Sequence, residues 1–106
     1  MADDVELSVV AGSFRARPGE EATLAALLAK YVVLTRMRPH CRNVDLVMSV
    51  TESGRFLVVE KWDDPDAQRA HLDAEETVEM ARAAVEILAA KPDLGLYEVV
   101  SAHDLD

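Results

Sequence analysis

The chain has few residues that could cross-link it or hold a metal. Among its 106 residues there is one cysteine, Cys41, and the three histidines, His40, His71 and His103, lie about thirty positions apart. A single cysteine cannot form an internal disulfide, and no set of Cys and His residues has the spacing of a zinc site. We therefore expect a reduced, cytoplasmic protein without a structural metal.

Long apolar runs, a signal-like N-terminus and excess basic charge are also missing. No hydrophobic stretch approaches the ~18 residues of a membrane span, and "MADDVELSVV" lacks the basic and then apolar layout of a secretory signal. The net charge of −9, from 20 acidic and 11 basic residues, would repel phosphate backbones. We therefore expect no membrane and no nucleic acid among its partners. The length fits a single domain, residues 1–106 with a core at about 5–101.

What the chain does contain is apolar patterning that switches between the periods of strand and helix. In the first predicted strand Gly12 marks a bulge or a close backbone approach. Asp63 or Asp64 can cap a helix that has Pro65 in its first turn, and this helical region is interrupted near Asp73. The patterns predict strands at 5–14, 41–50, 55–62 and 94–101, and helices at 20–36, from 65 to the break, and from the break to 90.

This order of elements is the split βαβ pattern of ferredoxin-like folds. It predicts an α+β, βαββαβ chain whose four-stranded antiparallel sheet has helices on one face only. The strands are nevertheless apolar on both sides, since Leu57 and Val59 alternate with Phe56 and Val58. An uncovered apolar patch on a sheet usually marks an interface, so we expect a second copy of the chain to cover it in a homodimer.

Two stretches, "TRMRPHCRNVDLVMS" and "GRFLVVEKWDDPDAQRAHLD", resemble the antibiotic biosynthesis monooxygenase (ABM) domain, a family of dimeric α/β barrels. The resemblance runs from about Val5 to Val100. Its markers are the turn "RPGEE", the cysteine after the first helix, the strand end Glu60-Lys-Trp62, and the Ala-His71 pair nine residues beyond the tryptophan.

The resemblance implies a homodimer whose two sheets pack together, with a pocket in each protomer between sheet and helices. Family members described as monooxygenases oxidise phenolic or quinol-like aromatics with dioxygen and use no bound flavin or metal, so it also implies that no cofactor is needed. Other members degrade haem, isomerise small phosphorylated sugars or have no assigned activity.

The chain departs from the family at several positions. Members often carry a second His a few residues after the first, where this chain has Glu76. The haem-degrading branch uses an Asn, a Trp and a His at places that correspond here to Gly12, His71 and Met80, so haem degradation is disfavoured. A sugar-phosphate isomerase would need a cationic pocket, and the sequence places none clearly near His71.

Two residues are candidates for proton transfer. His71 lies in a predicted element that can face the pocket, and an imidazole can accept a proton at neutral pH; the alternative is one backbone hydrogen bond and packing. Glu60 shares one side of its strand with Trp62, where a carboxylate could accept a phenol proton. The alternative for Glu60 is an ion pair with Arg42 or Arg55 that holds the hairpin in register.

The candidates for substrate binding are mainly aromatic. Trp62 offers a flat apolar wall with one N–H donor, although core packing would also explain it. Cys41 is expected to act as a small hydrophobic residue, because a reactive thiol needs an accessible, electropositive setting. The other possible lining residues, each also compatible with the core or an interface, are Asn43, Met48, Phe56, Tyr31 and Tyr97.

The leading hypothesis is a cofactor-independent monooxygenase that acts on a small phenolic or quinol-like aromatic. His71 or Glu60 would take the proton, Trp62 would stack on the ring, and Asn43 or Tyr97 would hold oxygens. The alternative is a non-catalytic dimeric module for small-molecule binding or scaffolding, with a small and well-filled space beside Trp62.

Overall fold

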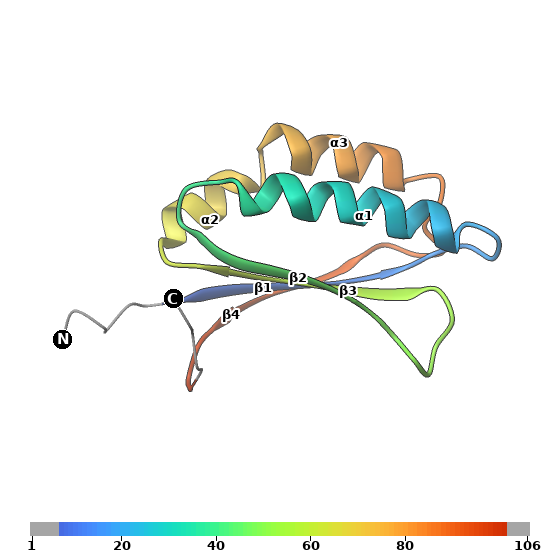
Figure 1. Cartoon of the computed structure of the whole chain (residues 1–106), viewed down its shortest axis with the longest axis horizontal. Coiled ribbons are helices and arrows are strands. Elements are labelled where there is room, and N and C mark those ends of the chain that lie inside the picture. The colour runs from blue at the N-terminus through green and yellow to red at the C-terminus, as the bar shows by residue number, and fades with distance from the viewer. Residues whose placement is uncertain (1–6, 102–106) are drawn as a thin grey trace.

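The computed structural model describes residues 7–101 and has the predicted order of elements (Figure 1). Its four strands form one antiparallel sheet in the order β2-β3-β1-β4, and all three helices lie on one face of that sheet. This confirms the α+β, ferredoxin-like class. The elements are β1 (Ser8–Arg15), α1 (Glu21–Arg36), β2 (Cys41–Met48), β3 (Arg55–Trp62), α2 (Pro65–His71), α3 (Glu75–Ala84) and β4 (Asp93–Glu98).

The chain turns from the sheet into α2 as the sequence predicts. The Asp64 side chain accepts a hydrogen bond of 3.0 Å from the backbone N–H of Asp66, and Pro65 occupies the first helical position. This cap supplies a partner for an otherwise unpaired N–H, and proline has no N–H to lose there. The helix ends at His71, a break follows, and α3 begins at Glu75.

The second long helix ends earlier than predicted. The periodic pattern predicts helix as far as residue 90, but α3 ends at Ala84. The backbone beyond it turns toward the end of β1, where Leu88 forms an isolated bridge with Ala16 and the Ala89 N–H donates to the Arg15 carbonyl at 2.8 Å. Pairing with the sheet therefore overrides an amphipathic pattern that continues past the helix.

Gly12 marks a close approach and not a bulge. The register of β1 with both β3 and β4 is continuous through this residue, and the irregularity in the sheet lies instead between Cys41 and Asn43. A Cβ atom at Gly12 would lie 2.9 Å from Leu94 Cδ2 and 3.0 Å from Phe14 Cε1. Glycine therefore leaves room for neighbouring side chains beneath the helices.

The core fills the space between the helices and the sheet face that they cover. Alternation along β3 sends Phe56, Val58, Glu60 and Trp62 to this face, where all four are buried. The core side chains that come from α1 are Leu24, Leu28, Tyr31 and Val32.

The opposite face of the sheet carries no helix (Figure 1), and we call it the open face. Its apolar members are Val9, Ala11, Val47, Leu57, Val59 and Tyr97, as the burial pattern and strand register show. The sheet is therefore apolar on both sides, as predicted, although Asn43, Asp45 and Lys61 make the end of the open face near the start of β2 polar. Within residues 7–101, no helix is both long and apolar enough to cross a membrane.

Candidate active site

A cavity of about 450 Å³ lies between the covered face of the sheet and the helices. Most of its wall is apolar and comes from β1, β3, α3 and the segment after α3. Its polar lining gathers mainly around α2 and the residues facing it, namely Tyr31, Glu60, Gln68, His71 and Thr77. Lys91, in the segment after α3, also lines the cavity. Such a cavity suits a largely apolar ligand that carries a few oxygens at one place.

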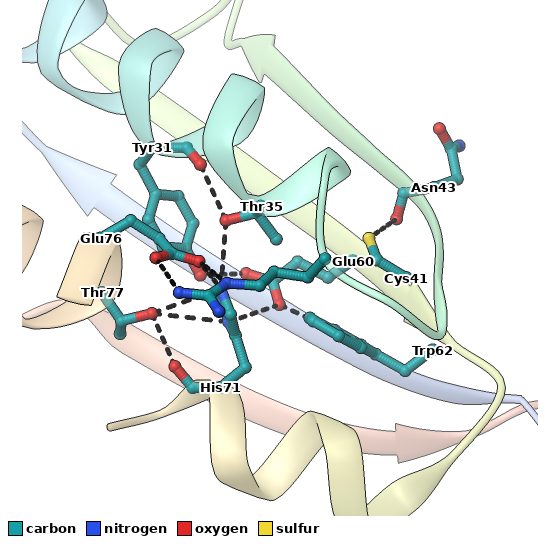
Figure 2. Close-up of polar contacts among 10 residues, drawn as sticks. Tyr31, Thr35, Cys41, Asn43, Glu60, Trp62, His71, Glu76 and Thr77 are labelled. Carbon is teal, nitrogen blue, oxygen red and sulfur yellow. Dashed lines mark hydrogen bonds and ion pairs between the residues drawn. The ribbon is translucent and has the colours of Figure 1, made fainter. Parts of the chain in front are cut away.

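Glu60 is a buried carboxylate that accepts hydrogen bonds from two neutral donors (Figure 2). The Tyr31 hydroxyl donates to Oε2 at 2.5 Å, and the Trp62 indole N–H donates to Oε1 at 3.0 Å. Burial, together with the adjacent Glu60, raises the pKa of Tyr31, so the hydroxyl remains a donor. Arg55, one of the two ion-pair partners considered for Glu60, instead binds Glu52, at 2.5 Å.

Glu76, at the start of α3, is bound in the opposite way, by a cation. Arg38 donates from Nε and Nη2 to its two oxygens, both at 2.6 Å. This paired hydrogen bond, outweighing the effect of burial, lowers the pKa of Glu76 to about 2. Glu76 is therefore ionised at any physiological pH.

His71 lies between the two carboxylates (Figure 2). Its Nε2 is 3.0 Å from Glu76 Oε2 and 3.3 Å from the Thr35 hydroxyl, whose own proton goes to the Tyr31 carbonyl at 2.7 Å. The Thr77 hydroxyl, 3.5 Å from Nε2, likewise gives its proton to the His71 carbonyl at 2.7 Å. All three neighbours of Nε2 are thus acceptors, which assigns the proton of the neutral ring to Nε2. The basic nitrogen is then Nδ1, which lies 4.0 Å from Glu60 Oε1.

Trp62 packs against the His71 ring and does not line the large cavity. Its ring centroid is 4.9 Å from that of His71, and the indole is almost fully buried. It borders a smaller cavity of about 210 Å³, which Arg38 and His71 also line. His71 thus lies between the two cavities, with the indole packed against it.

The remaining predicted binding residues lie elsewhere. Phe56 is part of the core, Met48 on the edge strand β2 is 63% exposed, and neither lines the large cavity. Asn43 and Tyr97 lie on the open face, so the structure does not bring them to His71. Burial, followed by the effect of Glu60, raises the pKa of Cys41 to about 11, which keeps its thiol protonated, as expected of a small hydrophobic residue.

Sequence reasoning gave no role to Thr35, Gln68 or Thr77, and it noted Glu76 only as a departure from the family. It placed Arg38 in a basic cluster with Arg36 and Arg42, which either binds an anion or is solvated at a helix end, and did not pair it with Glu76. The Thr77 hydroxyl donates to the His71 carbonyl at 2.7 Å and so ties α3 to the end of α2. His40 pairs with Asp63 at the surface, and His103 lies outside the described residues. In the described part of the chain, no cluster of three or more His, Cys, Asp or Glu side chains could hold a metal ion.

The family model described as antibiotic biosynthesis monooxygenase matches residues 8–86, which is most of the chain. The chain belongs to the antibiotic biosynthesis monooxygenase family. The large cavity of this ABM protein lies between sheet and helices, where the resemblance in sequence implied a pocket. A search of curated proteins gave no match.

Solved structures agree with the ABM fold over almost the whole chain. Rv0793 of Mycobacterium tuberculosis is 22% identical, with 91% of this chain and 97% of that one covered and a TM-score of 0.84. A Shewanella oneidensis protein, SO0527, is 24% identical, with 91% and 93% covered and a TM-score of 0.84. A Deinococcus radiodurans protein named for the same family is 22% identical, with 93% and 98% covered and a TM-score of 0.82. Identities this low show a shared fold and leave the substrate open.

Proposed function

We propose that this ABM protein is a monooxygenase that oxidises a small phenolic or quinol-like aromatic with dioxygen and requires no bound cofactor. The observation that carries the proposal is that His71 and Glu60, with Nδ1 4.0 Å from Oε1, both line the largely apolar cavity of about 450 Å³. The family name supports the monooxygenase class, and the apolar wall supports an aromatic ligand.

The substrate itself supplies the electrons in this reaction. A phenol that has a ring C–H opposite its hydroxyl reacts with one dioxygen to give a quinone and one water. The O–H bond and that C–H bond break, a second C=O bond forms, and the other oxygen atom leaves as water. The step that needs a protein is deprotonation, because a phenolate gives electrons to dioxygen far more readily than a phenol.

The polar cluster has the parts for that step. Nδ1 of His71 takes the phenol proton, while Glu76, fixed by Arg38, holds Nε2–H in place. The imidazolium that forms lies between two carboxylates and against the Trp62 ring, which stabilise its charge. The apolar wall orients the ring and excludes water from the reactive intermediate.

An oxygen electrode tests the proposal. Purified protein is screened against naphthols, naphthoquinols and anthrones, with oxygen uptake and product measured together. We expect uptake with at least one of them, no product under anaerobic conditions, and a loss of about tenfold or more in His71→Ala. His40→Asn is the matched control, because it removes a surface histidine, and asparagine tolerates the φ of 72° at this position. Full activity in His71→Ala would remove this histidine from the mechanism.

The same screen separates the enzyme from a non-catalytic binding module. In a binding module, an aromatic ligand that enters the large cavity would change the fluorescence of Trp62, the chain's one tryptophan, whose ring packs 4.9 Å from that of the cavity-lining His71. No ligand of the panel would then cause oxygen uptake.

The open face supports a homodimer as the functional unit. Val9, Leu57, Val59 and Tyr97 lie on neighbouring strands in the middle and at one edge of this face. A contiguous apolar patch of this kind is usually covered, and a second copy of the same sheet offers a matching surface.

Sedimentation at micromolar concentration tests the homodimer. We expect a dimer for the natural chain and a monomer for Leu57→Glu, which places a charge on the open face. Val33→Glu is the control, since Val33 is an exposed apolar residue on α1, on the other side of the molecule. A natural chain that sediments as a single subunit would contradict the dimer.

A further inference from the structure

Gln68 is a buried polar residue with an uncommitted hydrogen-bond donor. It lies on α2, one turn before His71, lines the large cavity and is only 6% exposed. Its Nε2 has no hydrogen-bond partner among the described residues. A buried amide in this state is destabilising, so a partner that arrives with a ligand would relieve a cost that the empty protein carries.

The other buried polar side chains of the cavity already have partners. The Tyr31 hydroxyl donates to Glu60, and His71 Nε2–H is held by Glu76. In the part of the chain that the structure describes, Gln68 is the buried side chain that leaves a donor free. This donor is itself buried in the empty protein, so it reaches an acceptor on the ligand only if the side chain turns.

We propose that Gln68 binds a carbonyl oxygen of the ligand, so that the ligand is an aromatic hydroxyketone rather than a simple phenol. This inference rests on the proposed function, because it takes the ligand's hydroxyl to be at His71. Residues three apart on a helix share a face, with Cβ atoms about 5–6 Å apart. The two side chains can thus reach a hydroxyl and an adjacent carbonyl on one ring system. Because Nε2 is itself buried, the proposal includes a rotation about the last bond of the Gln68 side chain, which exchanges the places of its amide oxygen and nitrogen.

Two ligands that differ by one oxygen test this inference. Acetylnaphthol has a carbonyl beside its hydroxyl, and ethylnaphthol has the same shape with a methylene in place of that carbonyl. Calorimetric titration under anaerobic conditions measures binding apart from any oxidation. We expect the natural chain to bind acetylnaphthol about five- to tenfold more tightly, which is the usual value of one hydrogen bond.

Variants at Gln68 then assign that preference to the side chain. Gln68→Met should abolish the preference while it leaves the affinity for ethylnaphthol within about twofold. Gln68→Glu, which replaces the donor by an acceptor, should reverse the preference. Arg69→Leu is the control, because this neighbour on α2 is exposed and pairs with Asp66, and it should keep the preference unchanged. Circular dichroism verifies that each variant is folded.

Each outcome bears on the proposal. Equal binding of the two ligands by the natural chain, or a preference that survives in Gln68→Met, would overturn the role of Gln68 even if oxygen uptake were observed. Gln68-dependent binding without oxygen uptake would support Gln68 and contradict the monooxygenase. No binding of either ligand would overturn the hydroxyketone proposal, while the oxygen-uptake screen decides the monooxygenase separately.

Discussion

Glu60 and Glu76 are two buried carboxylates on opposite sides of one imidazole, and the protein treats them differently. Glu76 faces Nε2 and is fixed as an anion by the two hydrogen bonds from Arg38. Glu60 lies near Nδ1, and its hydrogen bonds come from a hydroxyl and an indole, which carry no charge.

Because their hydrogen-bond donors differ in charge, we expect the two carboxylates to have different roles in the proposed reaction. A carboxylate paired with arginine keeps its charge and acts as an anchor, so Glu76 sets the orientation and tautomer of His71. A buried carboxylate bound by neutral donors lacks such compensation, and a proton that arrives on His71 Nδ1 supplies it. In the proposed reaction, the positive charge that forms on His71 lies near Glu60, with Nδ1 4.0 Å from Oε1, while Glu76 orients the ring through Nε2. Substitutions on each side of the ring should separate these roles.

Glu60→Gln should give the largest effect. The amide keeps the shape, and its oxygen can still accept from Trp62, which can only donate. It removes the charge that stabilises the imidazolium, so we expect kcat/KM to fall about a hundredfold with the substrate found in the oxygen screen. Glu79→Gln, an exposed substitution on α3, is the control. A Glu60→Gln enzyme that keeps half of its activity would show that this charge does not assist proton transfer.

Glu76→Gln should have a smaller effect on the same reaction. The amide oxygen can still accept from His71 Nε2–H, so the tautomer survives, but the anchor to Arg38 loses its charge. We expect kcat/KM to fall about tenfold, with the loss mainly in kcat because orientation is affected and not the apolar wall. A decrease larger than that of Glu60→Gln would reverse the roles assigned to the two carboxylates.

Acid should weaken the ion pair between Glu76 and Arg38 as the Glu76 carboxylate becomes protonated. The pKa of Glu76 is lowered from 4.5 to about 2 in the folded chain, so its contribution to stability is complete above pH 4.5 and is lost as pH falls toward 2. With Arg38 half exposed, we expect this contribution to be on the order of 1 kcal/mol. Urea unfolding of the natural chain and of Glu76→Gln should show a stability difference that shrinks across this range. A difference that stays constant down to pH 3 would contradict the ion pair.

The sequence predicts the contacts of this site that join residues close together in the chain, and it does not predict those that join distant residues. Glu60 and Trp62 are two positions apart on one strand, so alternation predicts their shared side, and the structure confirms it. The same alternation places Asn43 and Val44 on opposite faces of the sheet, and Asn43 indeed lies on the open face, away from the cavity. Residue type made Asn43 a candidate, whereas its position on the strand argues against a place in the pocket.

The rest of the cluster depends on contacts that no local pattern reports. Arg38 and Glu76 are 38 positions apart and meet because the end of α1 packs beside the start of α3. Tyr31 and Glu60 are 29 positions apart and meet because α1 lies across the sheet. The sequence did not predict the early end of α3 for the same reason. Contacts of the following segment with the end of β1, and not the helix's own apolar pattern, decide where the helix stops.

Tyr31→Phe should have the smallest effect on turnover, and it tests a single hydrogen bond to Glu60. It removes only the hydroxyl that donates to Glu60 Oε2, and the Trp62 N–H still binds the other oxygen. Because Glu60 lines a cavity large enough to hold water, we expect a loss of only about 0.5–1 kcal/mol in unfolding free energy. Turnover should change by less than about fivefold, since the charge on Glu60 and the anchor at Glu76 both remain. A loss of turnover as large as that of Glu60→Gln would mean that the hydroxyl itself takes part in proton transfer, and the contrast between the two carboxylates would then have to include Tyr31.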